Sequence, residues 1–417
     1  MDYDSYNNLT IETKYINDSL YGSISLSKFA IEIIDTKEFQ RLRYLKQLGT
    51  CYLIYPNAIH TRFEHSLGTY NLCKELCLKL FTNTSIDEMD KYLKEIKELK
   101  TYFKNIYSEN SYKFDTFIRE LINISALCHD LGHGPFSHIF DEYFLENSFL
   151  KNHPNSSHEV RSCLILEKII KKSELLNKII TNDLLNFMKN IINPSKENLG
   201  FIYQIVSNNF NSLDVDKFDY ITRDTYSLGI KSEFDYRRLI NHCKILNNTI
   251  CYSDKCSFDI YALFHTRHRM HKQVYSHKGV ISTQIMISEI INSLADYINI
   301  SECLDNLDLF CKLTDNFIIE LPKILNFTSE NITNLNIQKS YKLIQKIESH
   351  KLYSTIGYFI SKIKFNIDKD SLFPDSEINL DLIEIYQVKI GFVSGNKPNP
   401  FDNIYLYNNN ENSKFKI

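Results

Sequence analysis

Glycine and proline are scarce in this chain, with 11 glycines and 8 prolines among 417 residues. Both residues interrupt regular structure and mark turns, so their scarcity favours long helices over an architecture of many short strands. Apolar residues recur at helical spacing over 26–47 and over 62–81, which predicts a helix in each range. We therefore expect a mainly α-helical fold, with strand-like stretches near 248–258, 381–393 and 403–407.

The chain is long enough for one large domain with a smaller companion. We expect an irregular N-terminal segment over 1–25, a helical domain over 26–300 and a small α+β lobe over 301–417. Residues 82–112 stand apart within the helical domain, because a capping-box pattern and a new apolar stripe begin there. This segment is predicted to be an inserted, solvated amphipathic helix.

Charge and apolar patterning limit the environments in which the chain can work. The formal net charge is -3, so no global basic field predicts non-specific nucleic-acid binding. The chain opens on a polar, acidic stretch rather than a secretory signal, and no apolar run approaches the roughly 20 residues of a membrane helix. Its ten cysteines include no CxxC pair. We expect an intracellular protein, cytoplasmic or nuclear, with reduced cysteines and no membrane contact.

Histidine, aspartate and basic residues concentrate in four segments. These are HTRFEHSLG (60–68), CHDLGHGPFSHIFD (128–141), DVDKFDYITRD (214–224) and FHTRHRMHKQVYSHK (264–278). A lone histidine is usually structural. The adjacent pair His129-Asp130 is different, because at a helix end both side chains can reach one ion.

With His65 and Asp216, this pair makes a set of two imidazoles and two carboxylates. Such a mixed nitrogen and oxygen set suits a divalent transition metal such as Mn, Fe or Zn. It is too rich in nitrogen for Ca and lacks the thiolates of structural zinc sites. Four protein ligands leave coordination positions for water and a substrate oxygen. The predicted metal ligands are therefore His65, His129, Asp130 and Asp216.

The same segments carry cations and proton-transfer candidates. Three cations flank the predicted ligands and are suited to phosphate oxygens: Arg62, Lys217 and Arg267. Proton transfer near neutral pH falls most often to histidine, and three candidates lie close by: His133, His138 and His158. Asp141 and Glu159 are predicted to orient them.

These four segments, together with IIDTKEFQRLRYLKQLG (33–49) and SNNFNSLDVDK (207–217), resemble the SAM-and-HD-domain deoxynucleoside triphosphate triphosphohydrolases. The dipeptide HD alone is a weak motif, whereas six such segments in order are specific. The resemblance covers about residues 13–300, and more loosely 340–410. It implies a helical HD fold in a chain that lacks the SAM domain. It also implies hydrolysis of a deoxynucleoside triphosphate to a deoxynucleoside and inorganic triphosphate.

The resemblance also implies roles for individual residues. It places the ion on the four ligands named above. The residues implied to hold the phosphates are Arg62, Lys217, Tyr220 and Arg267. The implied catalytic proton donor is His138, with support from His133, Asp141 and His158. Gln47 and Asp224 look like readers of the sugar 3′-hydroxyl. Leu48 and Tyr275 look like an apolar wall that leaves no room for a 2′-hydroxyl.

Regulation by nucleotides is implied as well. Family members that respond to GTP or to a deoxynucleoside triphosphate bind this activator as homo-oligomers, either dimers or tetramers. The positions that match the activator site are Lys14, Asp35, Gln40, Arg43, Arg238, Lys255 and Lys278, so the segment 1–25 would contribute to it. Ser253 and His350 stand where the family carries Arg, and Ser276 where it carries Gln. The resemblance therefore does not fix activation or base preference. Mg bound to the triphosphate is a further implied cofactor.

Two other functions remain as alternatives. An HD phosphohydrolase acting on other nucleotides, such as monophosphates or cyclic dinucleotides, would need fewer phosphate anchors than Lys217, Tyr220 and Arg267 supply. A nucleic-acid-binding scaffold with a vestigial HD site would not need intact ligands and proton-transfer residues. Nucleic-acid binding is compatible with the leading hypothesis but is not required by it.

Overall fold

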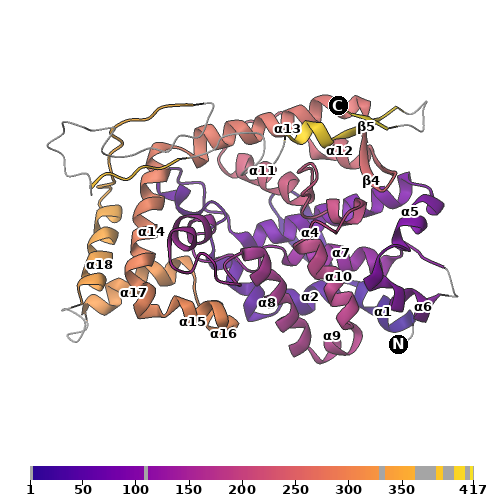
Figure 1. The fold of residues 1–417 in the computed structure, drawn as a ribbon, viewed down its shortest axis with the longest axis horizontal. Coiled ribbons are helices and arrows are strands. Elements are labelled where there is room, and N and C mark those ends of the chain that lie inside the picture. The colour runs from indigo at the N-terminus through magenta and orange to yellow at the C-terminus, as the bar shows by residue number, and fades with distance from the viewer. Residues whose placement is uncertain are drawn as a thin grey trace.

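The computed structural model describes residues 3–107, 111–327, 334–361, 382–387, 399–408 and 414–416. Helices dominate it, which confirms the expected mainly α-helical class (Figure 1). The helices are α1 (Tyr3–Thr10), α2 (Lys28–Ile34), α3 (Lys37–Gln40), α4 (Arg62–Asn83), α5 (Ile86–Leu93), α6 (Lys100–Ile106), α7 (Thr116–Cys128), α8 (His158–Lys172), α9 (Glu174–Ile179), α10 (Asn182–Ile192), α11 (Val215–Ser227), α12 (Tyr236–Asn241), α13 (Ser257–Met270), α14 (Lys278–Ile298), α15 (Ile300–Asp305), α16 (Leu307–Phe310), α17 (Asp315–Phe327) and α18 (Leu335–Glu348). The strands are β1 (Glu12–Asp18), β2 (Gly22–Ser27), β3 (Cys243–Leu246), β4 (Thr249–Ser253), β5 (Tyr405–Tyr407) and β6 (Lys414–Lys416).

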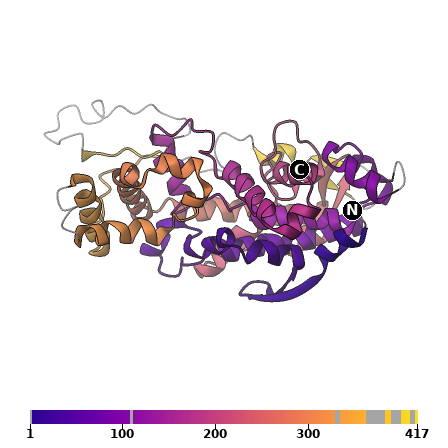
Figure 2. The same cartoon turned by 90° about the horizontal axis from the view of Figure 1, so that it is seen from below.

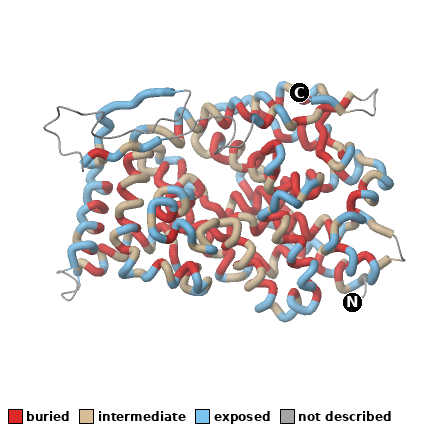
Figure 3. Tube along the Cα trace, in the orientation of Figure 1, coloured by how far each residue is buried: buried red, intermediate tan, exposed pale blue. Residues whose placement is uncertain are grey.

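The core is built around α4 and α7. These two helices pack against each other, and α11 packs on α4. Most side chains of α7 are buried, as expected of a helix that is apolar on nearly all sides. Figure 3 shows the buried segments concentrated in this interior. The predicted helix over 62–81 is confirmed as α4.

The N-terminal segment departs from expectation. Residues 1–25 were expected to be irregular, but α1 is followed by an antiparallel hairpin of β1 and β2, seen in indigo in Figure 2. The Asp18 carboxylate closes the hairpin by accepting from the backbone N–H groups of Leu20 (2.8 Å) and Tyr21 (3.1 Å). An aspartate that bonds the backbone two residues on is a turn-forming device, and the strands on either side of this turn were not expected.

The single helix predicted over 26–47 is also wrong. The chain forms α2, breaks at Asp35, forms α3 and ends in a 3-10 turn over Arg41–Tyr44. The break has a local cause, because the Thr36 hydroxyl accepts from the backbone N–H of Phe39 and starts a new helix. Helical periodicity cannot detect a break that keeps the apolar side chains facing the same core.

Residues 82–112 form two helices, α5 and α6, rather than one. Their apolar side is not solvated: Met89, Leu93, Leu99 and Phe103 are buried and join the main core, whereas Ile86 stays 62% exposed. The predicted amphipathic character is therefore right, and the predicted single solvated helix is wrong.

A four-stranded sheet joins distant parts of the chain in the order β3-β4-β5-β6. The hairpin expected near 248–258 starts earlier, as β3 and β4. The stretch 403–407 contains β5, which pairs in parallel with β4. Residues 382–387 contain no strand, and the rest of the strand-like stretch 381–393 lies outside the described residues. All ten cysteines are free thiols. Among the described helices, none has the length and apolarity needed to cross a membrane.

Candidate metal centre

The first turn of α4 carries two residues of the site. Thr61 caps this helix: its hydroxyl accepts from the backbone N–H of Phe63, and the Glu64 side chain accepts from the N–H of Thr61 at 3.0 Å. This capping box fixes where the helix begins. Arg62 and His65, one turn apart, are consequently buried on the same side of α4.

His129 and Asp130 follow the last residue of α7. The Nδ1 of His129 bonds to the carbonyl of Ala126 at 2.8 Å, so this nitrogen must carry the proton. In a neutral imidazole the Nε2 atom then keeps a lone pair for a ligand. Asp216 lies in the first turn of α11, which Asp214 caps by accepting from the backbone N–H of Lys217 at 2.9 Å.

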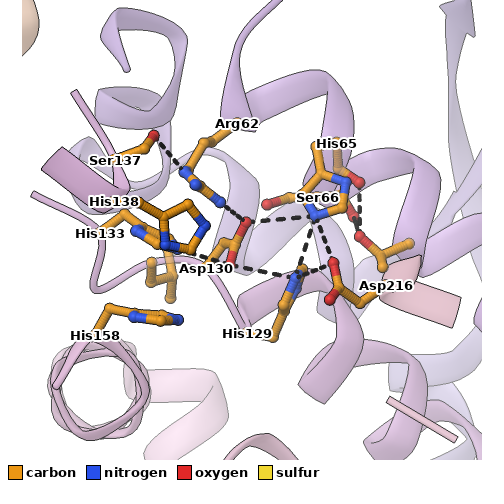
Figure 4. Close-up of polar contacts among 12 residues, drawn as sticks. Arg62, His65, Ser66, His129, Asp130, His133, Ser137, His138, His158 and Asp216 are labelled. Atoms are coloured by element: carbon orange, nitrogen blue, oxygen red, sulfur yellow. Dashed lines mark hydrogen bonds and ion pairs between the residues drawn. The ribbon is translucent and has the colours of Figure 1, made fainter. Parts of the chain in front are cut away.

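Donor atoms of four side chains from these three segments face one another (Figure 4). His65 Nε2 lies 3.3 Å from His129 Nε2, 3.4 Å from Asp130 Oδ2 and 3.1 Å from Asp216 Oδ1. His129 Nε2 lies 3.3 Å from Asp130 Oδ1 and 3.4 Å from Asp216 Oδ1. Three of the predicted ligands, His65, His129 and Asp130, thus have donor atoms that all lie within 4.8 Å of one another, and Asp216 joins them through its contacts with both imidazoles.

This arrangement fits a divalent cation. Metal–donor distances of about 2.0–2.2 Å place neighbouring donors about 3–3.5 Å apart around an ion, which matches the spacing found here. Burial alone would lower the pKa of His65, but hydrogen bonds with Asp216 and Asp219 raise it to about 10. The carboxylates therefore favour positive charge at the point where the imidazole nitrogens meet. A cation with nitrogen and oxygen ligands would supply that charge.

Asp219 supports the site from behind and was not predicted to do so. Its Oδ2 lies 2.7 Å from His65 Nδ1, while Tyr21 donates to Oδ1 at 2.7 Å and Arg223 donates to both oxygens. Burial would raise the pKa of Asp219, but Arg223 and His65 lower it to about 2. A carboxylate behind a ligating histidine fixes the orientation of the ring. The signal was present in the sequence, since Asp219 follows Asp216 by one turn of α11.

Gly68, the last residue of the segment HTRFEHSLG, leaves room for Asp219 behind His65. A Cβ atom on Gly68 would lie 1.9 Å from Asp219 Oδ1 and 2.5 Å from Arg223 Nη2. Gly132 plays a similar part, because its Cβ would lie 2.1 Å from the carbonyl oxygen of His158. Both positions require glycine, because a larger side chain would clash with atoms of the neighbouring segment. This explains why the two glycines lie beside the predicted ligands.

The predicted phosphate-binding cations lie around the donor cluster. Arg62 pairs with Asp130, and its Nε donates to the Ser137 hydroxyl at 2.8 Å. Arg267 Nε donates to the Tyr220 hydroxyl at 3.2 Å. Lys217 lies above the Tyr220 ring, with Nζ 5.8 Å from its centroid. Arg62 thus contacts the predicted ligand Asp130, and Lys217 interacts electrostatically with both Asp216 and Arg267.

The proton-transfer candidates form a second cluster. The rings of His133 and His158 stack with centroids 3.9 Å apart, and His158 Nδ1 lies 3.1 Å from Asp141 Oδ2. His133, His158 and Asp130 also have donor atoms within 4.8 Å of one another. Burial and nearby Arg62 hold the pKa of His133 well below its usual value. His133 is therefore a neutral imidazole at physiological pH.

His138 has a different partner from the one expected. Its Nδ1 lies 3.1 Å from Glu142 Oε1, whereas Asp141 contacts His158 and His133. Desolvation would lower the pKa of His138, but the hydrogen bond with Glu142 raises it. Asp141 is in turn held by Arg161, whose Nη2 lies 2.5 Å from Asp141 Oδ1. Neither Glu142 nor Arg161 was predicted from the sequence to take part in the site. Glu159 was predicted to orient the histidines, and its Oε1 atom lies 3.5 Å from His158 Nε2.

Asp224, one of the two predicted sugar-reading residues, is contacted by two side chains. Tyr275 donates to Asp224 Oδ2 at 2.5 Å, and His60 Nε2 lies 2.8 Å from Oδ1. Leu48 and Tyr275 pack against the same small apolar cluster. The side-chain oxygen of Gln47 is buried without a hydrogen-bond partner in the described structure. From the sequence, His60 was expected to have only a structural role. Its contact with Asp224 makes it part of this cluster.

The predicted activator positions fall into separate groups in one chain. Lys14 Nζ lies 3.6 Å from Asp35 Oδ1, and Arg43 donates to Gln40 at 2.8 Å. Three other positions lie elsewhere: Arg238, which donates to the Lys255 carbonyl at 3.1 Å, Lys255 itself and Lys278 at the start of α14. Figure 1 shows α2 and α12 on opposite sides of α4.

Comparison with known proteins identifies the fold of this site. Residues 62–199 match the HD domain family model. An HD domain-containing protein of Acanthamoeba polyphaga mimivirus is 41% identical over 416 residues, covering 96% of this chain and 86% of that protein.

Two further relatives are triphosphohydrolases. The deoxynucleoside triphosphate triphosphohydrolase SAMHD1 homolog of Dictyostelium discoideum is 34% identical over 87% of this chain, and human SAMHD1 is 32% identical over 82%. The matches span 64% and 55% of those two proteins. This chain therefore belongs to the HD-domain family that includes the SAMHD1 triphosphohydrolases.

Proposed function

We propose that this chain hydrolyses deoxynucleoside triphosphates to a deoxynucleoside and inorganic triphosphate, using a divalent metal. One observation carries the proposal: His65, His129, Asp130 and Asp216 converge within 3.4 Å contacts, next to Arg62, Lys217 and Arg267. A triphosphate brings nearly four negative charges. A group of three cations therefore suits a triphosphate better than it suits a monophosphate. The names and activities of the SAMHD1 relatives support the same substrate class.

The side chains divide the work of the reaction. A divalent ion held by the four ligands would activate water and polarise a phosphoryl oxygen. Arg62, Lys217 and Arg267 would hold the triphosphate in line for attack of water on the α-phosphorus. The bond from that phosphorus to the 5′-oxygen breaks, and the 5′-oxygen must gain a proton. His138 is suited to donate it, because its hydrogen bond with Glu142 raises its pKa and so favours the protonated imidazole.

The sugar cluster explains a preference for deoxyribose. We assign the 3′-hydroxyl to Gln47, whose buried oxygen lacks a partner, and to Asp224. Leu48 and Tyr275 would pack against the 2′-carbon. An added 2′-hydroxyl would then lose its water and gain no hydrogen bond there, which costs binding energy.

The cofactor, the regulation and the setting belong to the same proposal. We expect Mn, Fe or Zn at the histidine and aspartate ligands, with Mg on the triphosphate. The divided activator positions favour a homo-oligomer, dimer or tetramer, that binds GTP or a deoxynucleoside triphosphate between copies. Ten free cysteines suit a reducing, intracellular setting, cytoplasmic or nuclear.

The test is product analysis by ion-pair chromatography with each deoxynucleoside triphosphate, with and without GTP. We expect deoxynucleoside and triphosphate in a 1:1 ratio, loss of turnover with a chelator, and recovery on adding Mn. The double variant His129→Ala, Asp130→Ala should be inactive, whereas Lys171→Ala on the exposed side of α8 should match wild type.

Other outcomes would contradict the proposal. Diphosphate or monophosphate products would point to an HD phosphohydrolase with different regiochemistry. Binding of single-stranded RNA with a steep salt dependence and no turnover of any nucleotide would favour the nucleic-acid scaffold. Full activity in the double variant would refute the metal centre itself.

A further inference from the structure

Asp315 reaches the catalytic region from the C-terminal helices. It is the first residue of α17 and is 5% exposed. Its Oδ1 accepts from the backbone N–H of Phe136 at 2.6 Å, and its Oδ2 accepts from the backbone N–H of Lys46 at 2.8 Å. One carboxylate therefore holds two backbone segments that are 90 residues apart in sequence.

Both of these segments carry residues of the proposed active site. Lys46 directly precedes Gln47 and Leu48. Phe136 lies in the loop between His133 and His138. The two segments also touch each other, because the Ser137 hydroxyl donates to the carbonyl of Lys46 at 2.7 Å and accepts from Arg62 Nε at 2.8 Å. Asp315 thus completes a closed set of bonds around the substrate-facing loop.

The loop that Asp315 holds is strained. Phe136 and Ser137 have φ angles of 58° and 59°. These angles lie in the left-handed region, which residues other than glycine rarely adopt. Such residues are energetically costly and persist only where the surroundings hold them in place. A charged acceptor on the Phe136 amide is a bond of the stronger kind, and it acts directly on this strained pair.

Three titratable groups interact electrostatically with this carboxylate: Arg41, Lys46 and the Tyr52 hydroxyl. Burial raises the pKa of Asp315 to about 6, although the two backbone N–H groups and the cations act in the opposite direction. A carboxylate accepts both N–H groups, whereas a protonated acid loses one acceptor to its own O–H.

We infer that Asp315 is a positioning residue for catalysis: its carboxylate fixes the loop bearing His138 against the sugar-reading segment Gln47–Leu48. This inference rests on the proposed function for its catalytic consequence. The clamp itself depends only on the two backbone hydrogen bonds and can be measured apart from any activity.

The decisive variant is Asp315→Asn, which keeps one acceptor oxygen and turns an NH2 group toward the other backbone N–H. Asp308→Asn is the matched control, because Asp308 lies on the adjacent α16 and pairs with Lys37, Lys168 and Lys172, none of which belongs to the proposed active site. Hydrogen exchange at pH 7.5, read by mass spectrometry, should become at least tenfold faster in the first variant only, in the peptide whose backbone N–H faces the NH2 group, whether that peptide covers Lys46 or Phe136. Turnover of the deoxynucleoside triphosphate should fall about 10- to 100-fold in kcat, with KM within about threefold of wild type.

The outcomes separate the clamp from the proposed function. Unchanged exchange at Lys46 and Phe136 would overturn the clamp, and faster exchange with unchanged kcat would overturn its catalytic role. A wild-type protein without turnover would sink the proposed function, while the exchange measurement would still decide on the clamp. If Asp315→Asn does not fold, wild type at pH 7.5 and pH 5 gives the same test. At least one of the two peptides should lose protection at pH 5 after correction for intrinsic exchange, and full protection retained in both peptides would overturn the clamp.

Discussion

The Oδ2 atom of Asp219 lies 2.7 Å from the Nδ1 atom of His65. This contact ties a carboxylate behind the ring to an imidazole that is one of the proposed metal ligands. It selects the side of the ring that carries the proton and directs Nε2 toward His129, Asp130 and Asp216. The proposed metal centre is therefore built in two layers, and the outer layer can be tested without substituting a proposed ligand.

Replacing Asp219 by Asn should weaken the metal centre. The variant keeps the size of the side chain but removes the negative charge behind His65, and such partners typically contribute 10- to 100-fold to metal affinity. Titration of the apoprotein with Mn, followed by calorimetry, should show a loss of about that size. Asp235→Asn, at the exposed start of α12, is the control. Equal affinity in wild type and Asp219→Asn would remove Asp219 from the site.

A methyl group at Gly68 should disrupt the same layer by overpacking. Its Cβ would lie 1.9 Å from Asp219 Oδ1, so the Asp219–Arg223 pair must shift. We expect Gly68→Ala to lower the free energy of unfolding by about 1–3 kcal/mol and to weaken Mn binding together with it. Chemical denaturation measures the first effect. Gly357→Ala is the control, since no atom lies within 4 Å of a Cβ there, and a Gly68→Ala protein as stable as that control would contradict the prediction.

Removing Arg161 should destabilise the cluster of His133 and His158. This side chain is fully buried, and it donates to Asp141 and to the carbonyls of Gly132, Asn155 and Ser156. Arg161→Met fills similar space but leaves Asp141 buried without its cation. A loss of about 3–5 kcal/mol is typical for breaking such a pair.

The matched control for Arg161 lies on the same helix. Lys171→Met removes an exposed i,i+4 pair with Glu167, which is expected to change stability by about 0.5 kcal/mol or less. Urea unfolding curves of the two variants give the comparison. Similar midpoints would show that the buried Arg161–Asp141 pair contributes no more than a surface pair.

His271 should make the folded protein sensitive to mild acid. Burial, Arg267 and His138 lower its pKa to about 3, whereas an unfolded histidine titrates near 6.5. The unfolded chain therefore takes up a proton first, so the stability that neutral His271 provides is complete above pH 6.5. It is lost progressively as the pH falls from 6.5 toward 3.

The variant His271→Gln should remove this dependence. Between pH 7.5 and pH 5 the wild type should lose about 1–2 kcal/mol more of its free energy of unfolding than the variant does. His350→Gln, at an exposed position, should follow the wild-type curve. Parallel curves for wild type and His271→Gln across this range would show that His271 does not titrate as described.

Residue types and spacing predicted much of the fold and of the candidate site. The 62–81 helix, the predominance of helices and the adjacent His129-Asp130 pair were all visible in short stretches of sequence. The local break before α3 was not visible, because the Thr36 cap depends on a single side chain whose hydrogen bond is an alternative to continuing the helix. The partners Asp219 and Glu142 lie within one turn of residues that were identified, so a closer reading of helical spacing would have found them.

The sequence by itself determined which groups can do chemistry, because ligand type, charge and helical periodicity are local properties of the chain. Only the tertiary structure decided which of these groups meet, since contacts such as Asp315 with Phe136 or β4 with β5 depend on packing between segments far apart in sequence. Periodicity indicates that a helix face is buried but not what it is buried against. That choice follows from the shape and hydrogen bonding of the whole core, and it placed the support for the catalytic loop on a C-terminal helix.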